Sequence, residues 1–135
     1  MAFVDDNVMD KLVFVASPYR AETQEGVEKN LAFALSFMKK LWEMKREVGI
    51  APHCYFPQFL EESDDLCRKA GIDCGLEIMK LCSKMYVVGE IISKGMEIEI
   101  DVAKSLSMPI IYAEDPNKFF ATKQSHGTTS ESQSL

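Results

Sequence analysis

The feature that most constrains this fold is a short apolar run followed at once by a long stretch with a different hydrophobic period. Residues 11–16 read K-L-V-F-V-A, rich in β-branched and aromatic side chains, and end at the loop-forming pair Ser17-Pro18. From about residue 23 to residue 47, apolar side chains recur at three- and four-residue steps, which predicts an amphipathic helix. A buried strand followed by such a helix is typical of a β-α-β unit in a parallel sheet.

The rest of the chain repeats this alternation. Short apolar runs predict three more strands, and polar or periodic stretches between them predict helices. We therefore predict an α/β fold: a single-domain Rossmann-like or flavodoxin-like open parallel sheet with helices on both faces. The further strands are expected at residues 49–53, 85–89 and 108–112, and the further helices at residues 61–70, 76–83 and 93–106.

The chain length fits one domain. Its 135 residues are 47% hydrophobic, enough for a packed core. Residues 1–10 are interpreted as an N-terminal extension and residues 11–120 as the folded domain. Residues 121–135 are rich in Ser, Thr and Gln without apolar periodicity, which predicts a disordered tail.

Charge and cysteine content limit the function classes. The formal net charge is −6 with no block of Lys or Arg, which argues against nucleic-acid binding but leaves small anionic ligands open. The start of the chain does not resemble a signal peptide, and no apolar stretch approaches the length of a membrane span. The four cysteines form no C-x-x-C pair, so we expect reduced thiols packed mostly as small hydrophobes, no zinc site, and a cytoplasmic location.

Ligands of open parallel sheets bind beyond the carboxyl ends of the strands. In this chain the rule selects residues 17–20, 53–56 and 89–99. Tyr55 and Phe56 in the second segment are interpreted either as rings that stack on a base or as core residues under a loop.

One carboxylate in the third segment is out of place. On a helical wheel of about 100° per residue, Glu97 falls on the polar arc and Glu99 near the middle of the apolar arc. A carboxylate there must be paired, protonated or facing a cavity. Because it follows the helix start closely, we expect the helix dipole to help keep Glu99 ionised. The alternative is a structural Glu99 that caps a neighbouring backbone or pairs with a buried Arg.

The surrounding residues carry a resemblance. The run from Ser93 to Ala103, S-K-G-M-E-I-E-I-D-V-A, resembles the signature of the nucleoside 2-deoxyribosyltransferase-like superfamily. The opening V-A-S-P-Y-R is similar to that superfamily's first strand and substrate loop. The resemblance covers most of residues 11–113 and implies the same α/β fold, a nucleoside or nucleotide substrate, no cofactor or metal, and a homo-oligomer.

The resemblance also implies residue roles. Glu99 corresponds to the nucleophile that attacks the anomeric carbon. Apart from the resemblance, Tyr19 is expected near the pocket, where its hydroxyl would orient Glu99 or its ring would simply pack. Ser93 would hold the 5′ end of the sugar, and Gly95 would let the backbone approach the ligand. The remaining substrate-binding candidates are Ser17, Pro18, Arg20, His53 and Met96.

Two details bear on substrate and activity. Ser93 occupies a position that is Asp in the transferases and Ser in the related 2′-deoxynucleoside 5′-phosphate N-hydrolases, and Arg20 is a natural phosphate partner, with a surface ion pair as its alternative role. Relatives also carry an upstream Asp that handles the proton on the base, whereas Asp73 and Glu77 here do not fall at that spacing. The leading hypothesis is an enzyme that cleaves or transfers N-glycosidic bonds. The alternatives are a non-catalytic nucleotide-binding or sensing module and, with less support, a flavodoxin-like redox domain.

Overall fold

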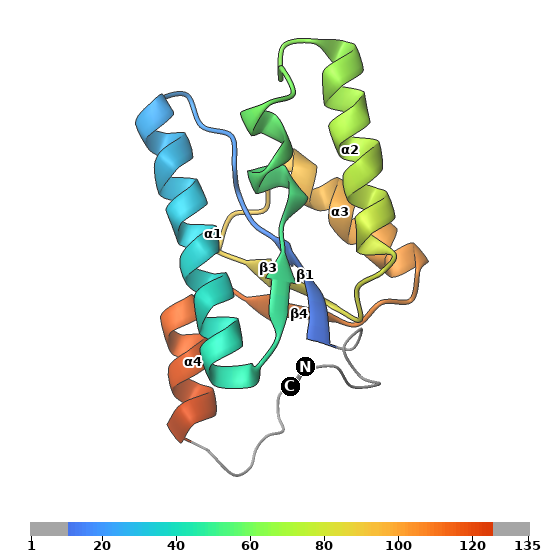
Figure 1. Cartoon of the computed structure of the whole chain (residues 1–135). Coiled ribbons are helices and arrows are strands. Elements are labelled where there is room, and N and C mark those ends of the chain that lie inside the picture. The colour runs from blue at the N-terminus through green and yellow to red at the C-terminus, as the bar shows by residue number, and fades with distance from the viewer. Residues whose placement is uncertain (1–10, 126–135) are drawn as a thin grey trace, which may run out of the picture.

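The computed structural model describes the backbone of residues 11–125 and the side chains of residues 11–121, and its centre is one parallel sheet (Figure 1). The strands are β1 (Leu12–Ala16), β2 (Val48–Ile50), β3 (Met85–Val88) and β4 (Ile110–Ala113). They are hydrogen-bonded in the order β2-β1-β3-β4, and every neighbouring pair is parallel. The predicted open parallel α/β sheet is confirmed.

Helices cover both faces of this sheet. On one face lie α1 (Gln24–Lys45) and α4 (Pro116–Ser125), and on the other α2 (Asp65–Met79) and α3 (Lys94–Ser105) (Figure 1). Two short 3-10 turns, η2 (Pro52–Cys54) and η3 (Phe56–Gln58), connect β2 to α2. Within residues 11–125, no helix is long and apolar enough to cross a membrane.

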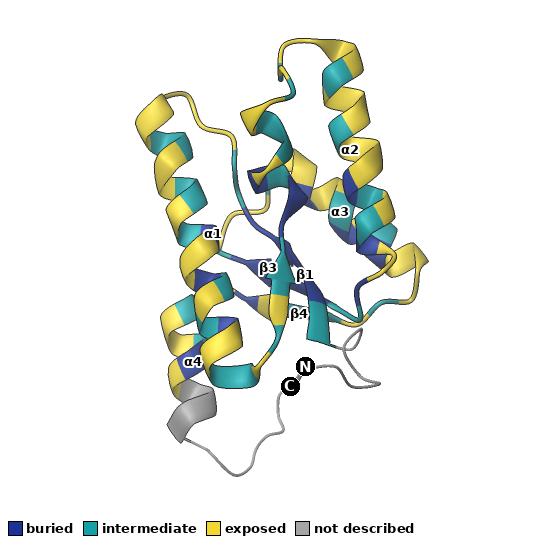
Figure 2. Cartoon of the chain, viewed as in Figure 1, coloured by how far each residue is buried: buried dark blue, intermediate teal, exposed yellow. Residues whose placement is uncertain are grey.

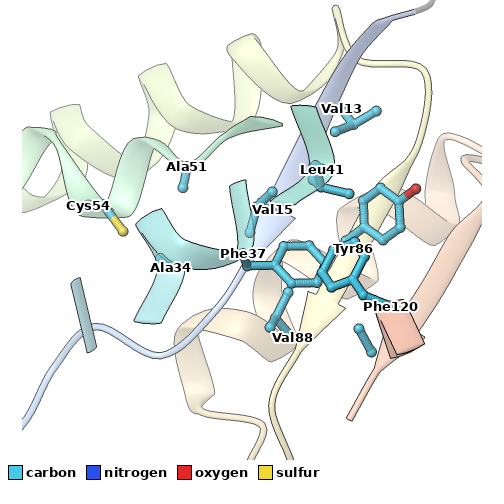
Figure 3. Close-up of a cluster of buried hydrophobic side chains, with 11 residues drawn as sticks. Val13, Val15, Ala34, Phe37, Leu41, Ala51, Cys54, Tyr86, Val88 and Phe120 are labelled. Carbon is cyan, nitrogen blue, oxygen red and sulfur yellow. The ribbon is translucent and has the colours of Figure 1, made fainter. Parts of the chain in front are cut away.

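The two-residue period of β1 divides the core into two clusters. Val13 and Val15 point to the α1 side, where Phe37 packs edge-on against Tyr86 and at a tilt against Phe120 (Figure 3). Phe14 and Ala16 point to the side of α2 and α3. Burial is therefore concentrated in the strands and the inner helix faces, while the outer helix faces are exposed (Figure 2).

Three local predictions need correction. The two helical pieces expected between residues 61 and 83 form the single helix α2, since Asp64 caps its start through the N–H groups of Leu66 and Cys67. Strand β2 ends at Ile50, because Pro52 begins a 3-10 turn instead of continuing the ladder. Helix α4 continues to Ser125, so residues 121–125 are not part of a tail. Residues 1–10 and 126–135, assigned to the extension and the tail, lie outside the described residues.

The strand order creates a crevice at one edge of the sheet. Strand β1 has β2 on one side and β3 on the other. The chain therefore leaves β1 towards β2 and later crosses to the opposite side of β1 to form β3, which opens a crevice at the carboxyl ends of these strands. Ser17 follows β1 at this edge, and Gly89 follows β3 with a φ of 102°, a value that favours glycine.

Candidate active site

All the residues predicted for the site line one cavity at this edge, with a volume of about 340 Å³. They come from the loop after β1, the η2 turn and the first turns of α3, which the strand order brings together. The nine are Ser17, Pro18, Tyr19, Arg20, His53, Ser93, Gly95, Met96 and Glu99.

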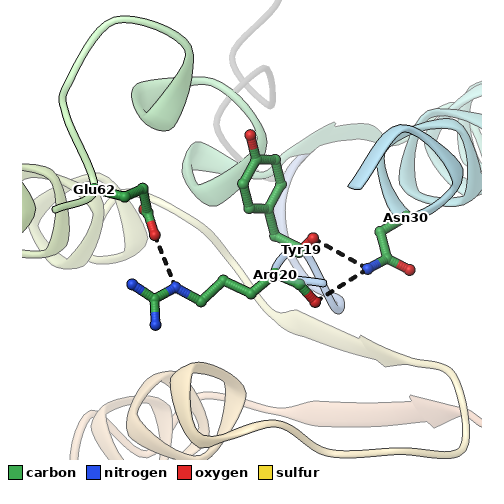
Figure 4. A network of polar contacts seen from close by, with 4 residues as sticks. All are labelled: Tyr19, Arg20, Asn30 and Glu62. Carbon is green, nitrogen blue, oxygen red and sulfur yellow. Dashed lines mark hydrogen bonds and ion pairs between the residues drawn. The ribbon is translucent and has the colours of Figure 1, made fainter. Parts of the chain in front are cut away.

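Helix α1 fixes the loop after β1. The side-chain amide of Asn30 donates to the backbone carbonyl of Tyr19 at 3.0 Å and to that of Arg20 at 3.4 Å (Figure 4). The guanidinium of Arg20 donates to Glu62, which also lines the cavity, at 2.8 Å (Figure 4). Arg20 therefore makes the ion pair that the sequence left as its alternative role, and phosphate binding by Arg20 stays a prediction.

The start of α3 is held by a reciprocal cap. The hydroxyl of Ser93 accepts from the N–H of Met96 at 3.2 Å, and the sulfur of Met96 accepts from the N–H of Ser93 at 3.5 Å. Both residues thus have a structural role besides lining the cavity. Gly95 differs, because a Cβ added to it would meet nothing closer than the Ser93 hydroxyl at 3.9 Å. Contacts within the chain do not explain a glycine there.

The helical wheel correctly predicted which carboxylate of α3 is exposed and which is buried. Glu97 is exposed, whereas the side chain of Glu99 is 17% exposed and faces the cavity. Ile98 and Leu106, placed on the apolar arc, are 47% and 41% exposed, because the cavity opens beside Ile98 and α3 ends at Ser105.

The expected ionisation of Glu99 is not supported. Burial raises the pKa of Glu99 from 4.5 to about 8. Glu99 is the sixth residue of α3, and the favourable field of a helix start falls off within its first turn. The cost of burying the charge therefore outweighs the dipole, and the carboxyl group is mostly protonated at neutral pH.

His53 lies between Ser17 and Glu99. Its Nε2 is 2.9 Å from the hydroxyl of the buried Ser17, and its Nδ1 is 3.9 Å from Oε2 of Glu99. This Nδ1 is fully buried and has no hydrogen-bond partner. Burial lowers the pKa of His53 from 6.5 to about 4, so the ring is neutral at neutral pH.

Two further groups approach this trio. Burial raises the pKa of the Cys54 thiol to about 11, an effect that the nearby Glu99 charge increases and a hydrogen bond from Ser17 opposes. The ring of Tyr19 packs against the first core cluster, and burial followed by the Glu62 charge raises its pKa. The partner that the structure gives Glu99 is His53, so the orienting role of Tyr19 stays a prediction.

Sequence reasoning missed the far wall of the cavity, which α2 and η3 provide. Gly71 and Gly75 of α2 face this wall, and a Cβ on them would lie in ordinary contact with Phe56 at 3.5 Å and with Pro52 at 3.4 Å. Residues 67, 68, 71, 72, 75 and 76 of α2 lie on one face and line the cavity, at the three- and four-residue spacing of a helix. That spacing could have indicated a helix face lining a cavity. It was hard to recognise because several of these residues are small or charged and give no apolar period.

In the aromatic segment after β2, Phe56 lies at the cavity, whereas Tyr55 fits neither predicted role. Phe56 lines the cavity, whereas Tyr55 does not line it and is 61% exposed. The rings of Tyr55, Phe56 and Phe59 contact one another. Stacking on a base is thus open to Phe56 alone among the two candidates.

The wall also brings positive charge to an acidic protein. Arg68 and Lys94 line the cavity with Arg20, and all three side chains are exposed to solvent. Only Glu62 and Glu99 oppose them among the lining acids, and Glu99 is mostly protonated at neutral pH. This local balance differs from the formal net charge of −6 of the whole chain.

The acids considered for an upstream proton donor lie elsewhere. Asp73 pairs with Lys69 at 2.7 Å and Glu77 pairs with Lys80 at 2.9 Å, both on the surface of α2. Neither lines the cavity.

All four cysteines are free, as expected. Cys54 and Cys82 are buried, but Cys67 lines the cavity and Cys74 is exposed, so only half pack as core residues. Within the part of the chain that the structure describes, no three His, Cys, Asp or Glu side chains are grouped to hold a metal ion.

Comparison with known proteins places the chain in a family. The model for the family described as "Domain of unknown function (DUF7768)" matches residues 11–113, the segment from β1 to β4. The chain belongs to this DUF7768 family. Helix α4 lies beyond the DUF7768 match, although its Phe120 is part of the core. No curated protein matches the sequence.

A solved structure shares the DUF7768 fold seen here. It is a 2-deoxyribosyltransferase from the psychrotolerant bacterium Bacillus psychrosaccharolyticus, with a TM-score of 0.59 and 18% identity. The match covers 82% of this chain and 94% of the transferase. At this identity the likeness establishes the fold, in agreement with the resemblance drawn from residues 93–103.

Proposed function

We propose that this protein cleaves or transfers the N-glycosidic bond of 2′-deoxynucleosides or their 5′-monophosphates, with Glu99 as the nucleophile. The observation that carries the proposal is the position of the Glu99 carboxyl group, which faces a cavity at the carboxyl ends of the strands with His53 beside it. A carboxylate that attacks an anomeric carbon forms a glycosyl ester, which water or a second base then resolves. The fold shared with a 2-deoxyribosyltransferase supports the same chemistry.

The charge of the cavity favours a monophosphate over a free nucleoside. Arg20, Arg68 and Lys94 stand around a cavity that also contains the N-terminus of α3, and both features attract phosphate. Ser93 at that N-terminus is uncharged and does not repel a phosphate as an Asp would. Phe56 on the η3 wall offers a ring surface to a base.

Base release tests the proposal. The protein is incubated with a panel of 2′-deoxynucleosides and their 5′-monophosphates, with and without a second base as acceptor, and free base is separated by chromatography. We expect release from at least one monophosphate, loss of that release in Glu99→Gln, and no loss in Glu97→Gln. The second variant makes the same change on the exposed side of the same helix.

A non-catalytic nucleotide-binding module is the second candidate. It is favoured by the absence of Asp73 and Glu77 from the cavity, because neither of these α2 acids then stands in for the upstream Asp of relatives. This candidate predicts that a monophosphate raises the melting temperature of the protein and that no base appears with any member of the panel.

Self-association is part of the proposal. Leu35 and Trp42 are 55% and 47% exposed on α1 and offer apolar surface for contact between copies. Light scattering on the eluting protein measures its mass. A mass of two or more chains is expected, and a monomer at all concentrations would contradict this part.

A further inference from the structure

One of the two ring nitrogens of His53 is buried without a hydrogen-bond partner. Its Nδ1 is buried and has no partner, while its Nε2 is held by Ser17 at 2.9 Å. Oε2 of the Glu99 carboxyl group lies 3.9 Å from this nitrogen. Buried polar atoms without partners are uncommon and ask for an explanation.

We propose that Nδ1 of His53 takes the proton from Glu99 as the carboxylate attacks the anomeric carbon, that Ser17 holds the ring with Nδ1 unprotonated, and that the same proton then passes to the leaving base. This inference rests on the proposed function and deepens it. It assigns the proton transfer for which no acidic side chain of α2 is in place.

The geometry supports this direction of transfer. Ser17 and Nε2 are 2.9 Å apart, and in the proposed tautomer Nε2–H donates to the Ser17 hydroxyl, which leaves a lone pair on Nδ1. Ser17 is 2% exposed and also hydrogen-bonds the Cys54 thiol, so its position is fixed by packing and by a second partner. The gap of 3.9 Å needs to close by about 1 Å for a hydrogen bond, and such contacts are often long before substrate binds.

The step balances for a purine or pyrimidine leaving group. Before reaction Glu99 is a carboxylic acid and His53 is neutral. In one concerted step the proton passes to Nδ1, a carboxyl oxygen bonds to the anomeric carbon, and the electron pair of the C–N bond moves to the base. A free carboxylate–imidazolium pair does not form first, because the pKa of Glu99 lies above that of His53. That base takes the proton from the imidazolium, so the products of this half-reaction are free base, a glycosyl ester on Glu99 and neutral His53.

Hydrolysis reverses the path of the proton. Neutral His53 accepts a proton from water as the oxygen attacks the anomeric carbon, and the ester bond breaks to release the Glu99 carboxylate. The imidazolium then returns the proton to Glu99, and the site is ready for another turnover. Because the proton stays inside the cavity, the rate does not depend on loss of a proton to solvent.

Other titratable groups face this pair. Cys54 comes from η2, Tyr19 and Arg20 from the loop after β1, and Lys94 from α3 itself. Cys67 and Arg68 come from α2, and Glu62 comes from the loop before it. The raised pKa values of Cys54 and Tyr19 keep both groups neutral through the range in which Glu99 and His53 titrate.

A pH profile distinguishes proton transfer from a merely structural role. We expect base release by the wild-type protein to change little between pH 6 and pH 8. In His53→Gln, whose amide can still bond Ser17, Glu99 must lose its proton to solvent. The kcat should fall by about 10²-fold or more at pH 6 and rise about tenfold per pH unit towards pH 8. Ser17→Ala should lower kcat by a smaller factor. Equal losses at every pH, or a fully active His53→Gln, would overturn the proposal.

A second measurement does not depend on turnover. In protein labelled with ¹⁵N-histidine, the shifts of the two ring nitrogens report the tautomer of His53, and the His53→Gln spectrum separates it from His126. We expect the neutral Nε2–H tautomer at pH 7, with a smaller Nε2–H population in Ser17→Ala. A ring protonated at Nδ1 at pH 7 would overturn this inference even if base is released. If the expected tautomer is found but the wild-type protein releases no base, the proposed function is refuted, and with it any catalytic use of the proton.

Discussion

Oε2 of Glu99 lies 3.9 Å from Nδ1 of His53, where the η2 turn meets helix α3. Both side chains are more than four-fifths buried, and burial moves their pKa values in opposite directions, to about 8 for Glu99 and about 4 for His53. Each group is therefore mostly neutral at pH 7, whereas in water at this pH the carboxyl group would be ionised and the imidazole partly protonated. Pairs of groups shifted apart in this way are characteristic of acid–base sites.

The free energy of unfolding should record these two shifts. The folded pKa of Glu99 lies above its ordinary value, so Glu99 contributes stability below pH 4.5 that is lost as the pH rises towards 8. The folded pKa of His53 lies below its ordinary value, so His53 contributes stability above pH 6.5 that is lost as the pH falls towards 4. Below pH 6.5 the two groups change the free energy of unfolding in opposite directions as the pH rises. Above pH 6.5 only the change due to Glu99 remains.

We therefore expect stability to fall between pH 6.5 and pH 8 by up to about 1.4 kcal/mol per pH unit. Urea denaturation at several pH values measures it. Glu99→Gln should remove the fall, and Glu97→Gln should leave it unchanged. A fall of the same size in Glu99→Gln would show that other groups cause it.

Gly95→Ala separates folding from ligand approach. An added Cβ meets no atom closer than 3.9 Å, and Ala favours a helix over Gly by up to about 1 kcal/mol, so stability should stay equal or rise. The methyl group would occupy space that a ligand at the start of α3 needs, and KM for the substrate should rise at least tenfold. Initial-rate kinetics and thermal unfolding of the same samples measure the two effects. An unchanged KM would remove Gly95 from the binding site.

Arg68→Gln tests the charged rim. If Arg68 contacts a phosphate, its loss should cost about 1.5–3 kcal/mol of binding, or roughly 10- to 100-fold in KM, for a monophosphate only. The matching free nucleoside should be affected little. Arg46→Gln is the control, because Arg46 ends α1 and stacks on Trp42 away from the cavity. Equal effects of Arg68→Gln on both substrates would contradict a phosphate contact.

Much of this site was predictable because it depends on local patterns. The wheel separated Glu99 from Glu97, and the rule for parallel sheets located the cavity before any side chain was placed. The contacts between distant segments were not predictable. The pairing of Arg20 with Glu62 joins residues 42 positions apart, and that of Ser17 with His53 joins residues 36 apart. No period in the sequence encodes such a choice of partner.

Two other errors have physical causes. The protonation of Glu99 depends on how deeply the neighbouring loops bury it, a quantity that the sequence of one helix does not contain. The tail was predicted to start too early because α4 follows the core through only two large apolar residues, Phe119 and Phe120. These pack against Phe37, but they are too few to give a helical period.

A contact at the opposite edge of the sheet should affect stability alone. The hydroxyl of Tyr86 donates to Glu47 at 2.6 Å, and Glu47 also pairs with Lys84. Burial, followed by the bond to Glu47, raises the pKa of Tyr86, so the hydroxyl stays a donor. Tyr86→Phe should lower the free energy of unfolding by about 1–3 kcal/mol, because a charged acceptor loses its partner. Base release by the folded variant should be unchanged, and a lower kcat would show that this edge influences the cavity.

The covalent intermediate tests the central claim most directly. A reaction with a 2′-deoxynucleoside 5′-monophosphate is quenched with acid during turnover, the protein is digested, and its peptides are measured by mass spectrometry. We predict a mass increase of one deoxyribosyl phosphate on the peptide that contains Glu99, absent in Glu99→Gln and present in Glu97→Gln. Base release by Glu99→Gln at the wild-type rate, with no adduct on that peptide in either protein, would contradict the account.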